Sequence, residues 1–329
     1  MLRILHDTNY DFIRWWKVMA VITVAFILLG LGSLAVKPPN YSIEFTGGTL
    51  MQLEFTQPPD VGEIRATLDQ GGVHGAEIQQ FGTNREFTVR AQNREAVSAQ
   101  SQGAESIAVT IENVLKKKFG ENNLKVVRTE AVGPRVGQEL KRGAIIAILL
   151  SFLITLVYLS IRFEWRFATA AVIATSHDVF TTIAFLKLMH LEISLTVVAG
   201  LLTVLGYSLN DTIIIFDRVR ENLRKGRKET LYETLNRSIN ETLPRSVLTH
   251  ATVLAATLSL LFFAGEVIRP FAWVMAFGII TGTFSSIYVA APVLLWIERK
   301  WPRKTGARQS SSTAMPTSQT RRSPATATR

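Results

Sequence analysis

Long apolar runs with few charged residues constrain this chain more than any other feature of its sequence. The first run, 18–36, carries no charged residue and is long enough to cross a bilayer as a helix. Five more runs follow, at 144–161, 167–186, 193–216, 245–265 and 271–297. Only helices and closed barrels satisfy their backbone groups inside lipid, and runs of this length match helices. The sequence therefore predicts a polytopic α-helical membrane protein with six transmembrane helices.

Basic residues gather at one end of these predicted helices. They occur in the N-terminal segment 1–17, the turn 162–166, the connector 217–244 and the tail 298–329. Basic loops stay on the cytoplasmic side of a membrane, and six spans that start inside place all four segments there. The formal net charge of +10 thus follows the flanks of apolar runs, which favours contact with lipid over binding to nucleic acid.

The two ends of the chain need separate interpretation. Ser33, Leu34 and Ala35 offer the small residues of a cleavage site, so the first run is either a signal peptide or an anchor. Its length and the later spans favour an anchor. The tail 298–329 is rich in Ser, Thr, Ala and Arg, and we expect it to be disordered.

The segment 37–143 has the composition of a water-exposed domain. Alternating apolar and polar residues predict strands at 41–46 and 50–55, on either side of Gly47 and Gly48. A helix, two strands, a helix and a strand are expected next, at 61–70, 76–81, 86–91, 95–119 and 124–131. Without the first strand the order is β-α-β-β-α-β, which predicts an α+β ferredoxin-like domain. The count of spans places it on the side of the membrane opposite the cytoplasm, between the first and second transmembrane helices.

Motifs of several enzyme classes are absent from the sequence. It contains no GxxxxGK[ST] phosphate loop, no GxSxG nucleophile motif and no cysteine. An intramembrane aspartyl protease needs two aspartates in its spans, but the segment 206–212 lacks the Gly-x-Gly-Asp form expected of one. We therefore expect neither an enzyme nor a bound cofactor.

Ionisable residues inside the predicted spans are candidates for function, because charge is costly in hydrocarbon. Asp178 lies about 16 Å along its helix, near the bilayer centre, and Asp211 about 9 Å from the end of its own. Arg245 begins the fifth span at that same end, directly after Pro244, which suits a first helical turn. An adjacent arginine holds a carboxylate ionised, whereas burial favours the protonated form. Movement of Arg245 would thus make Asp211 bind and release a proton.

Each of these residues also has a purely structural interpretation. Asp211 and Arg245 form either a proton-coupled pair or a static ion pair, and Arg245 is also placed to reach lipid headgroups. His177, Asn210 and His250 are either relay residues or polar packing residues. A metal site made of His177 and the two aspartates is an alternative, but we do not expect a bound metal.

Several short motifs make the sequence similar to a known family. They contain Gly47 and Gly48, Gly206 and Tyr207, and Gly282 and Ser285, within the segments 45–49, 132–134, 161–167, 177–178, 206–212, 216–222 and 282–287. In this order, between about Tyr10 and Trp301, they resemble SecF members of the SecD/SecF family, which belongs to the resistance-nodulation-division (RND) superfamily.

The resemblance implies a fold, partners and a driving force. It implies an RND-like half bundle in the bacterial inner membrane that pairs with SecD and associates with the SecYEG channel and YajC. Such a unit uses the proton motive force to promote late-stage export of preproteins. Asp211 and Arg245 match the family's proton-transport residues, and Asp178 matches a third-span residue of less defined role. Leu248, His250 and Ala251 depart from the small or hydroxylated residues of the family.

Two alternative functions remain open at this point. One is half of an RND-type efflux transporter, which would need a second six-helix half. The other is a purely structural or assembly subunit of the translocase that moves no protons.

Overall fold

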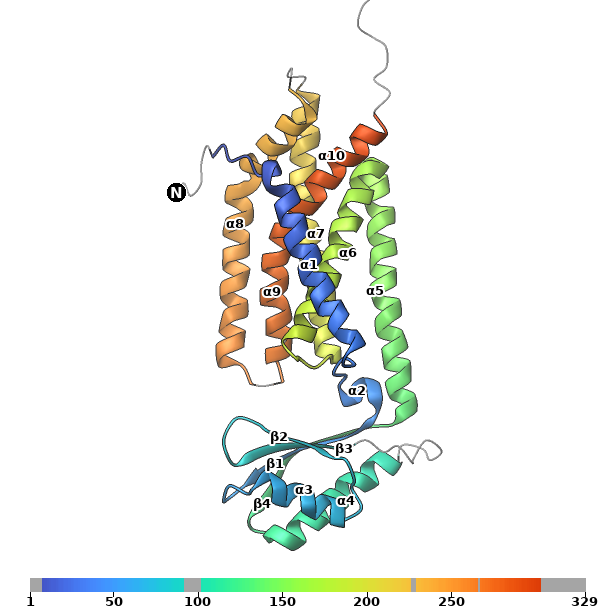
Figure 1. Cartoon of the computed structure of the whole chain (residues 1–329), viewed down its shortest axis with the longest axis vertical. Helices are drawn as coiled ribbons and strands as arrows, with labels where there is room; N and C mark the ends of the chain where they lie inside the picture. The colour runs from blue at the N-terminus through green and yellow to red at the C-terminus, as the bar shows by residue number, and fades with distance from the viewer. Residues whose placement is uncertain (1–7, 92–101, 226–228, 266, 303–329) are drawn as a thin grey trace, which may run out of the picture.

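The computed structural model describes residues 8–91, 102–225, 229–265 and 267–302 (Figure 1). Six helical segments are long and apolar enough to cross a membrane, as predicted. They are Ile13–Ala35, Pro134–Arg162, Trp165–Leu188, Leu195–Arg224, Leu231–Phe263 and Arg269–Lys300. An α+β domain lies beyond one end of this bundle, and the described N-terminal residues lie beside the span Leu231–Phe263 at the other end (Figure 1).

The first and last spans are composite. The first consists of a 3-10 turn Ile13–Trp15, helix α1 Trp16–Gly32 and a second 3-10 turn Ser33–Ala35. The last begins as α9 Arg269–Ser285, continues as the π-helical segment η4 Ser286–Ala290 and ends as α10 Ala291–Lys300. The predicted tail beyond residue 302 lies outside the described residues, as does 95–101 of the predicted helix 95–119.

Helices α5 Pro134–Arg162, α7 Leu195–Arg224 and α8 Leu231–Phe263 extend well beyond their apolar runs. The connector 217–244 is therefore largely helical in its described part. Thr230 starts α8 with a capping box: its side chain accepts from the Glu233 N–H, and the Glu233 carboxylate accepts from the Thr230 N–H. Consequently Pro244 lies inside α8, and the prediction that it occupies a first helical turn was wrong.

The α+β domain has the predicted β-α-β-β-α-β order. Its elements are β1 Gly48–Phe55, α3 Val61–Gln70, β2 Glu77–Gln80, β3 Glu86–Ala91, α4 Gln102–Phe119 and β4 Leu124–Val132. The sheet order is β2-β3-β1-β4, with every neighbouring pair antiparallel, which is the ferredoxin-like arrangement. Alternation along β1 buries Met51, Leu53 and Phe55 in one core with Ile111 and Leu115 of α4.

The predicted strand 41–46 is not a strand. Its residues form a single bridge at Tyr41 and then the short helix α2 Ile43–Thr46, which buries Ile43 and Phe45. Gly47 follows with φ +74°, and a Cβ there would lie 2.8 Å from Cα of Pro134 at the start of α5. The chain turns here between bundle and sheet, so this segment packs against helix ends and has no strand to pair with along its length.

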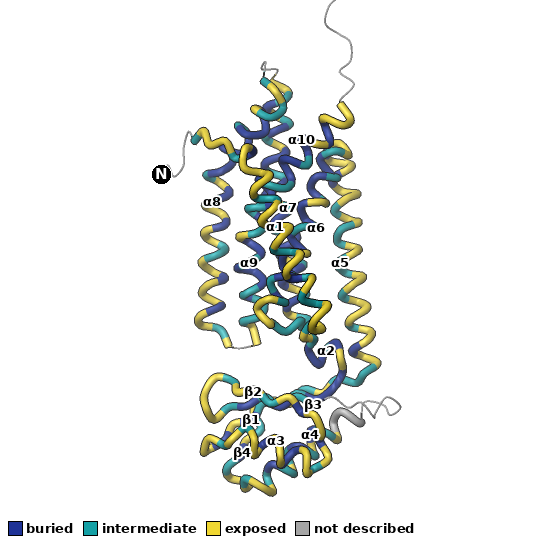
Figure 2. Tube along the Cα trace, in the orientation of Figure 1, coloured by how far each residue is buried: buried dark blue, intermediate teal, exposed yellow. Residues whose placement is uncertain are grey.

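Helices α6 (Trp165–Leu188), α7 and α9 form the centre of the bundle (Figure 2). The most apolar window of the first span and that of α5 are each only 6% buried, against 56% for α6. Small residues bring the central helices together, since a Cβ on Gly278 of α9 would lie 2.3 Å from Val204 of α7. The outer helices therefore leave apolar faces for lipid or other helices.

Candidate functional site: two buried aspartates in the helix bundle

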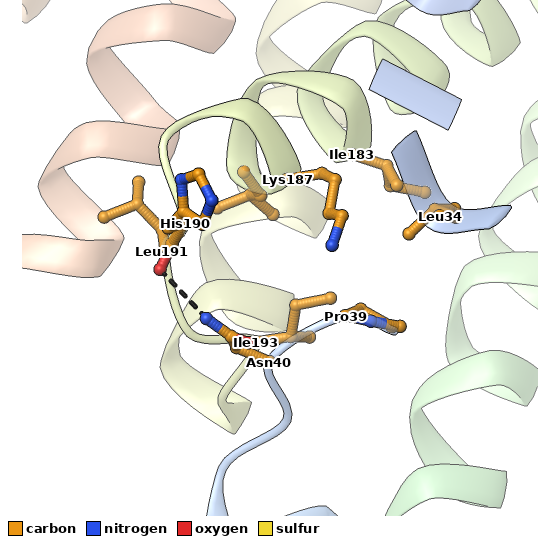
Figure 3. A pocket seen from close by; sticks show the side chains of 9 residues that line it. Leu34, Pro39, Asn40, Ile183, Lys187, His190, Leu191 and Ile193 are labelled. Atoms are coloured by element: carbon orange, nitrogen blue, oxygen red, sulfur yellow. Dashed lines mark hydrogen bonds between the residues drawn. The ribbon is translucent and has the colours of Figure 1, made fainter. Parts of the chain in front are cut away.

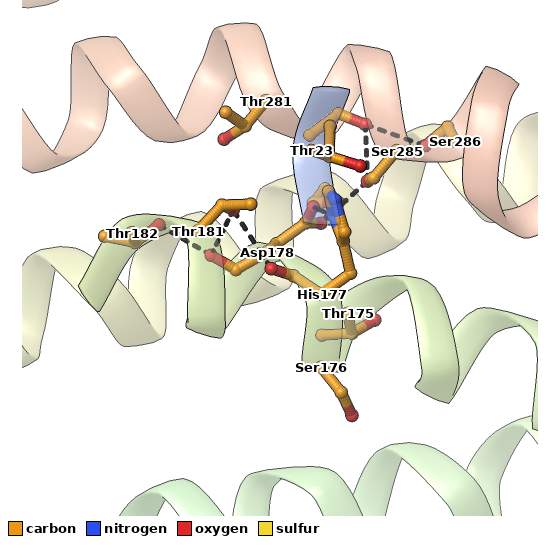
Figure 4. A network of polar contacts seen from close by, with 12 residues as sticks. Thr23, Thr175, Ser176, His177, Asp178, Thr181, Thr182, Thr281, Ser285 and Ser286 are labelled. Atoms are coloured by element: carbon orange, nitrogen blue, oxygen red, sulfur yellow. Dashed lines mark hydrogen bonds and ion pairs between the residues drawn. The ribbon is translucent and has the colours of Figure 1, made fainter. Parts of the chain in front are cut away.

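Asp178 lies where α6, α7 and α9 meet, and its side chain is fully buried. The Ser208 hydroxyl of α7 and the Ser285 hydroxyl of α9 donate to its Oδ2, at 2.5 and 2.8 Å. On its other side, Nδ1 of His177 lies 3.2 Å from Oδ1 (Figure 4). One carboxylate thus joins three helices through neutral hydroxyls and one imidazole.

His177 contacts Asp178 although the two residues are adjacent on one helix. The imidazole folds back toward the carboxylate and lies against the ring of Phe284, at 6.5 Å between centroids and 20° between planes. Its Nε2 is buried and makes no hydrogen bond in the part of the chain that the structure describes. Buried polar atoms normally have hydrogen-bond partners, and this nitrogen has none among the described residues.

Asp211 lies on α7 and is 3% exposed. The Ser246 hydroxyl of α8 donates to its Oδ1. Its Oδ2 is buried and accepts no hydrogen bond from the described residues. Asp211 therefore has one satisfied and one unsatisfied oxygen, unlike Asp178.

Arg245 does not pair with Asp211, contrary to the expected contact. Its side chain is exposed and lines a polar hollow that also contains Asp217, Glu221 and Glu241. Successive residues of a helix point about 100° apart, so Ser246 faces Asp211 while Arg245 faces outward. No carboxylate of the described residues forms an ion pair with Arg245.

His250 belongs to the surroundings of Asp211. It lies one helical turn after Ser246, on the same side of α8, and interacts electrostatically with Asp211. Its Nδ1 lies 3.0 Å from the Thr283 hydroxyl of α9, and the Tyr207 ring meets its ring edge-on at 5.2 Å. Sequence reasoning left His250 as a relay or packing residue, and the structure brings it to the aspartate.

The remaining predicted residues divide between interior and exterior. Ser285 contacts Asp178, and Gly282 packs closely, since a Cβ there would lie 2.9 Å from Cβ of Ser208. Gly206 and Asn210 lie instead on an exposed face of α7, and the Asn210 side chain has no hydrogen bond to the described residues. Gly47 and Gly48 form the turn below α5, far along the chain from the aspartates.

Sequence reasoning missed two serines that contact the aspartates. Ser208 of α7 donates to Asp178, and Ser246 of α8 donates to Asp211. Because each serine lies on a different helix from its aspartate, no spacing within one helix signals these contacts. Within the described residues, no group of three or more His, Cys, Asp or Glu is arranged to hold a metal ion.

Family models match most of the chain. Residues 110–300 match "Protein export membrane protein SecD/SecF, C-terminal", and residues 32–59 match "SecD/SecF GG Motif". The second match contains the Gly47-Gly48 turn, and the first contains both aspartates.

Curated relatives and solved structures agree with these matches. Protein translocase subunit SecF from Gemmatimonas aurantiaca is 62% identical over 92% of this chain and 91% of that protein. Protein translocase subunit SecF from Vibrio alginolyticus is 42% identical over 88% of this chain and 90% of that protein. The crystal structure of SecDF from Thermus thermophilus covers 91% of this chain with a TM-score of 0.79 and 34% identity. SecDF in a super-membrane-facing form covers 90%, with a TM-score of 0.65 and 36% identity.

This chain spans only 40% of the length of either SecDF chain, whereas it matches the separate SecF proteins along nine tenths of their length. Its six spans and single α+β domain are thus those of one half of the larger chain. The chain therefore belongs to the SecF proteins of the SecD/SecF family of protein-export membrane proteins.

Proposed function

We propose that this chain is the SecF half of a proton-driven export unit. It pairs with SecD in the bacterial inner membrane and uses the proton motive force to promote late-stage export of preproteins through SecYEG, with YajC as an accessory partner. Both termini face the cytoplasm and the α+β domain faces the periplasm. The observation that carries the proposal is the carboxylate of Asp211, buried in the bundle with one unpartnered oxygen.

A second membrane bundle is the partner that best fits the exposed polar face of α7 and α8. Asn210 and Arg245 are exposed on these two helices, and a Cβ added to Gly206 would meet no atom within 4 Å. Polar groups within a membrane face protein or water and avoid lipid. A carboxylate on the SecD half would form an ion pair with Arg245. The absence of a side chain at Gly206 permits a helix of the partner to approach closely.

Asp211 is suited to take up and release protons. Protonation neutralises a carboxylate that burial penalises in its charged form, and the Ser246 hydroxyl supplies a polar contact in either state. Arg245 lies one residue from Ser246, so rotation or displacement of α8 changes its distance to Asp211. Proton binding would thereby be coupled to the relative position of α7 and α8.

A set of contacts that we name the clasp joins the α+β domain to the bundle. It consists of the segment 37–44, Arg90 of β3 and the segment 187–195, which contains the end of α6, the loop that follows and the first residue of α7. Lys187 donates to the carbonyls of Lys37 and Pro38, at 2.7 and 3.1 Å. The Asn40 side chain donates to the carbonyl of His190 at 3.2 Å (Figure 3).

Backbone and charged groups complete the clasp. Ser42 N–H donates to the Ile193 carbonyl, and Ile193 N–H donates to the Asn40 carbonyl. The Glu44 carboxylate accepts from Leu195 N–H at 2.6 Å, at the N-terminus of α7, where negative charge is favoured. Arg90 of β3 pairs with Glu192 in the loop. The helix α6, which carries Asp178, ends at the clasp, and α7, which carries Asp211, begins there. Movement of these helices would therefore be transmitted through the clasp to the α+β domain.

The test uses vesicles that contain this chain, SecD and the SecYEG channel, scored for late-stage export with and without a proton gradient. Asp211→Asn should abolish the gradient-dependent gain while the complex still assembles. The matched control is Asp217→Asn, which neutralises an exposed carboxylate on the same helix and should retain the gain. Full gradient dependence of Asp211→Asn would instead favour the purely structural or assembly role.

A further inference from the structure

A basic hollow lies between the ends of α5 and α7 that point away from the α+β domain. Its lining residues come from both helices, from the turn after α5 and from the first turn of α6: Ile161, Arg162, Phe163, Glu164, Phe167, Arg220, Leu223 and Arg224. Three of these eight are arginines, and four are apolar. The hollow is separate from the buried aspartates and plays no part in the proton mechanism proposed above.

The three arginines form no ion pair with an acidic residue in the part of the chain that the structure describes. None of Arg162, Arg220 and Arg224 has a carboxylate within ion-pair distance among the described residues. The carboxylate of Glu164 lies 3.4 Å from Arg166. An adjoining hollow contains two carboxylates, those of Asp217 and Glu221. Glu221 forms ion pairs with Arg218 and Lys225, at 2.6 and 2.8 Å.

Two of the arginine side chains lie against the same aromatic ring. The guanidinium carbons of Arg162 and Arg220 lie 5.4 and 5.8 Å from the ring centroid of Phe163. Arg220 also donates to the carbonyl of Arg162 at 3.3 Å, which uses one of its five N–H donors. Both guanidinium groups thus flank one ring, and an anion that accepts from both side chains would gain charge-assisted hydrogen bonds.

The surroundings of the hollow are apolar on the side that faces the membrane. Ile161 is 82% exposed at its edge, and Leu153, Ile154 and Val157 continue an exposed apolar face along α5 toward the bilayer centre. A ligand that fits here has a phosphate for the arginines and a hydrocarbon chain for α5. A guanidinium group is planar, and two of its N–H donors can bind two oxygens of one phosphate at the same time.

We propose that this hollow is a specific binding site for the phosphate of an anionic glycerophospholipid. Arg162 and Arg220 bind the phosphodiester, Arg224 lies at the rim, and one acyl chain lies along the exposed face of α5. The lipid would fasten α5, which packs little against the rest of the bundle, to α7. This differs from general attraction of basic loops to headgroups, because one lipid is held by named residues of two helices.

The experiment uses the full chain in detergent, with dioleoylphosphatidylglycerol as the anionic probe and dioleoylphosphatidylcholine as the zwitterionic one. Native mass spectrometry gives the number of retained lipids, and lipid titration gives an apparent Kd. Arg162→Gln with Arg220→Gln should raise the Kd for the anionic lipid about tenfold or more, since hydrogen bonds to charged groups are lost. Arg224→Gln leaves the Arg220 contact intact and should raise it by a smaller factor.

The matched control is Arg299→Gln with Lys300→Gln, which removes two charges at the same end of the bundle, outside the hollow. It should bind the anionic lipid like the original chain. Equal loss in this control, or equal binding of phosphatidylcholine, would show general charge attraction and overturn the proposal. Displacement of the lipid by millimolar inorganic phosphate would identify free phosphate as the ligand and also overturn it. Thermal unfolding without lipid confirms that each variant is folded.

Discussion

The Ser246 hydroxyl of α8 donates a hydrogen bond to Oδ1 of Asp211 on α7, while Oδ2 of the same carboxylate is buried without a hydrogen-bond partner among the described residues. This relationship links two helices through a group that can gain or lose a proton. Asp178 is different, because two serines and His177 contact its two oxygens. In the proposed function Asp211 is therefore the carboxylate that changes its protonation, and Asp178 links α6, α7 and α9 through hydrogen bonds.

Removal of the Ser246 hydroxyl should weaken coupling between α7 and α8. We expect Ser246→Ala to reduce the gradient-dependent gain in export several-fold and to lower the free energy of unfolding by about 1–3 kcal/mol, because a buried acceptor loses its donor. Ser259→Ala is the control, since Ser259 is exposed on the same helix and bonds only to its own backbone. Equal export by the two variants would exclude a role for the Ser246 contact.

Close packing of α7 against α9 should be sensitive to a single methyl group. A Cβ at Gly278 would lie 2.3 Å from Val204, so Gly278→Ala should lower stability by about 1–3 kcal/mol through overpacking. At Gly206 no atom lies within 4 Å of the same position, so Gly206→Ala should leave the isolated chain equally or slightly more stable. Thermal unfolding of the purified chains measures both, and similar losses would contradict the packing geometry.

The ion pair between Arg90 and Glu192 should limit movement of the α+β domain relative to the bundle. Arg90→Ala should broaden the distribution of distances between spin labels placed on α4 and on the α6–α7 loop, because the contacts of Arg90 with Glu192 and with the Tyr41 carbonyl are lost. Arg85→Ala serves as the control, since its side chain is exposed and forms no ion pair with described residues. Unchanged distributions in Arg90→Ala would mean that the backbone contacts of the clasp suffice.

Glu192 also makes the stability of the folded chain depend on pH. Burial raises the pKa of this carboxyl above its ordinary value, and Arg90 opposes that effect. An acid whose pKa is raised in the folded state contributes most to stability at pH values below its pKa in the unfolded chain. That contribution is lost as pH rises through the folded pKa. Replacement of Arg90 by Ala should therefore raise the pKa of Glu192 further, as measured by NMR titration of labelled glutamate. A lowered or unchanged pKa would contradict the assigned balance.

Local patterns in the sequence were sufficient for the order of elements. Six apolar runs predicted six spans, and alternation in 50–55 and 86–91 predicted β1 and β3, because burial of one face repeats every second residue. The strand predicted at 41–46 was wrong for a non-local reason. Its alternating residues are buried against the start of α5 and the α6–α7 loop, which no window of sequence contains.

The sequence by itself determined which residues are costly to place in a membrane, and therefore selected Asp178, Asp211 and Arg245, since charge in an apolar run is visible without a structure. Only the tertiary structure decided what each one faces. The rotation of α8 turns Ser246 toward Asp211 and Arg245 outward, and it depends on where the helix begins and how it packs. The clasp and the arginine hollow likewise join segments far apart in the chain, so their contacts exist only after folding.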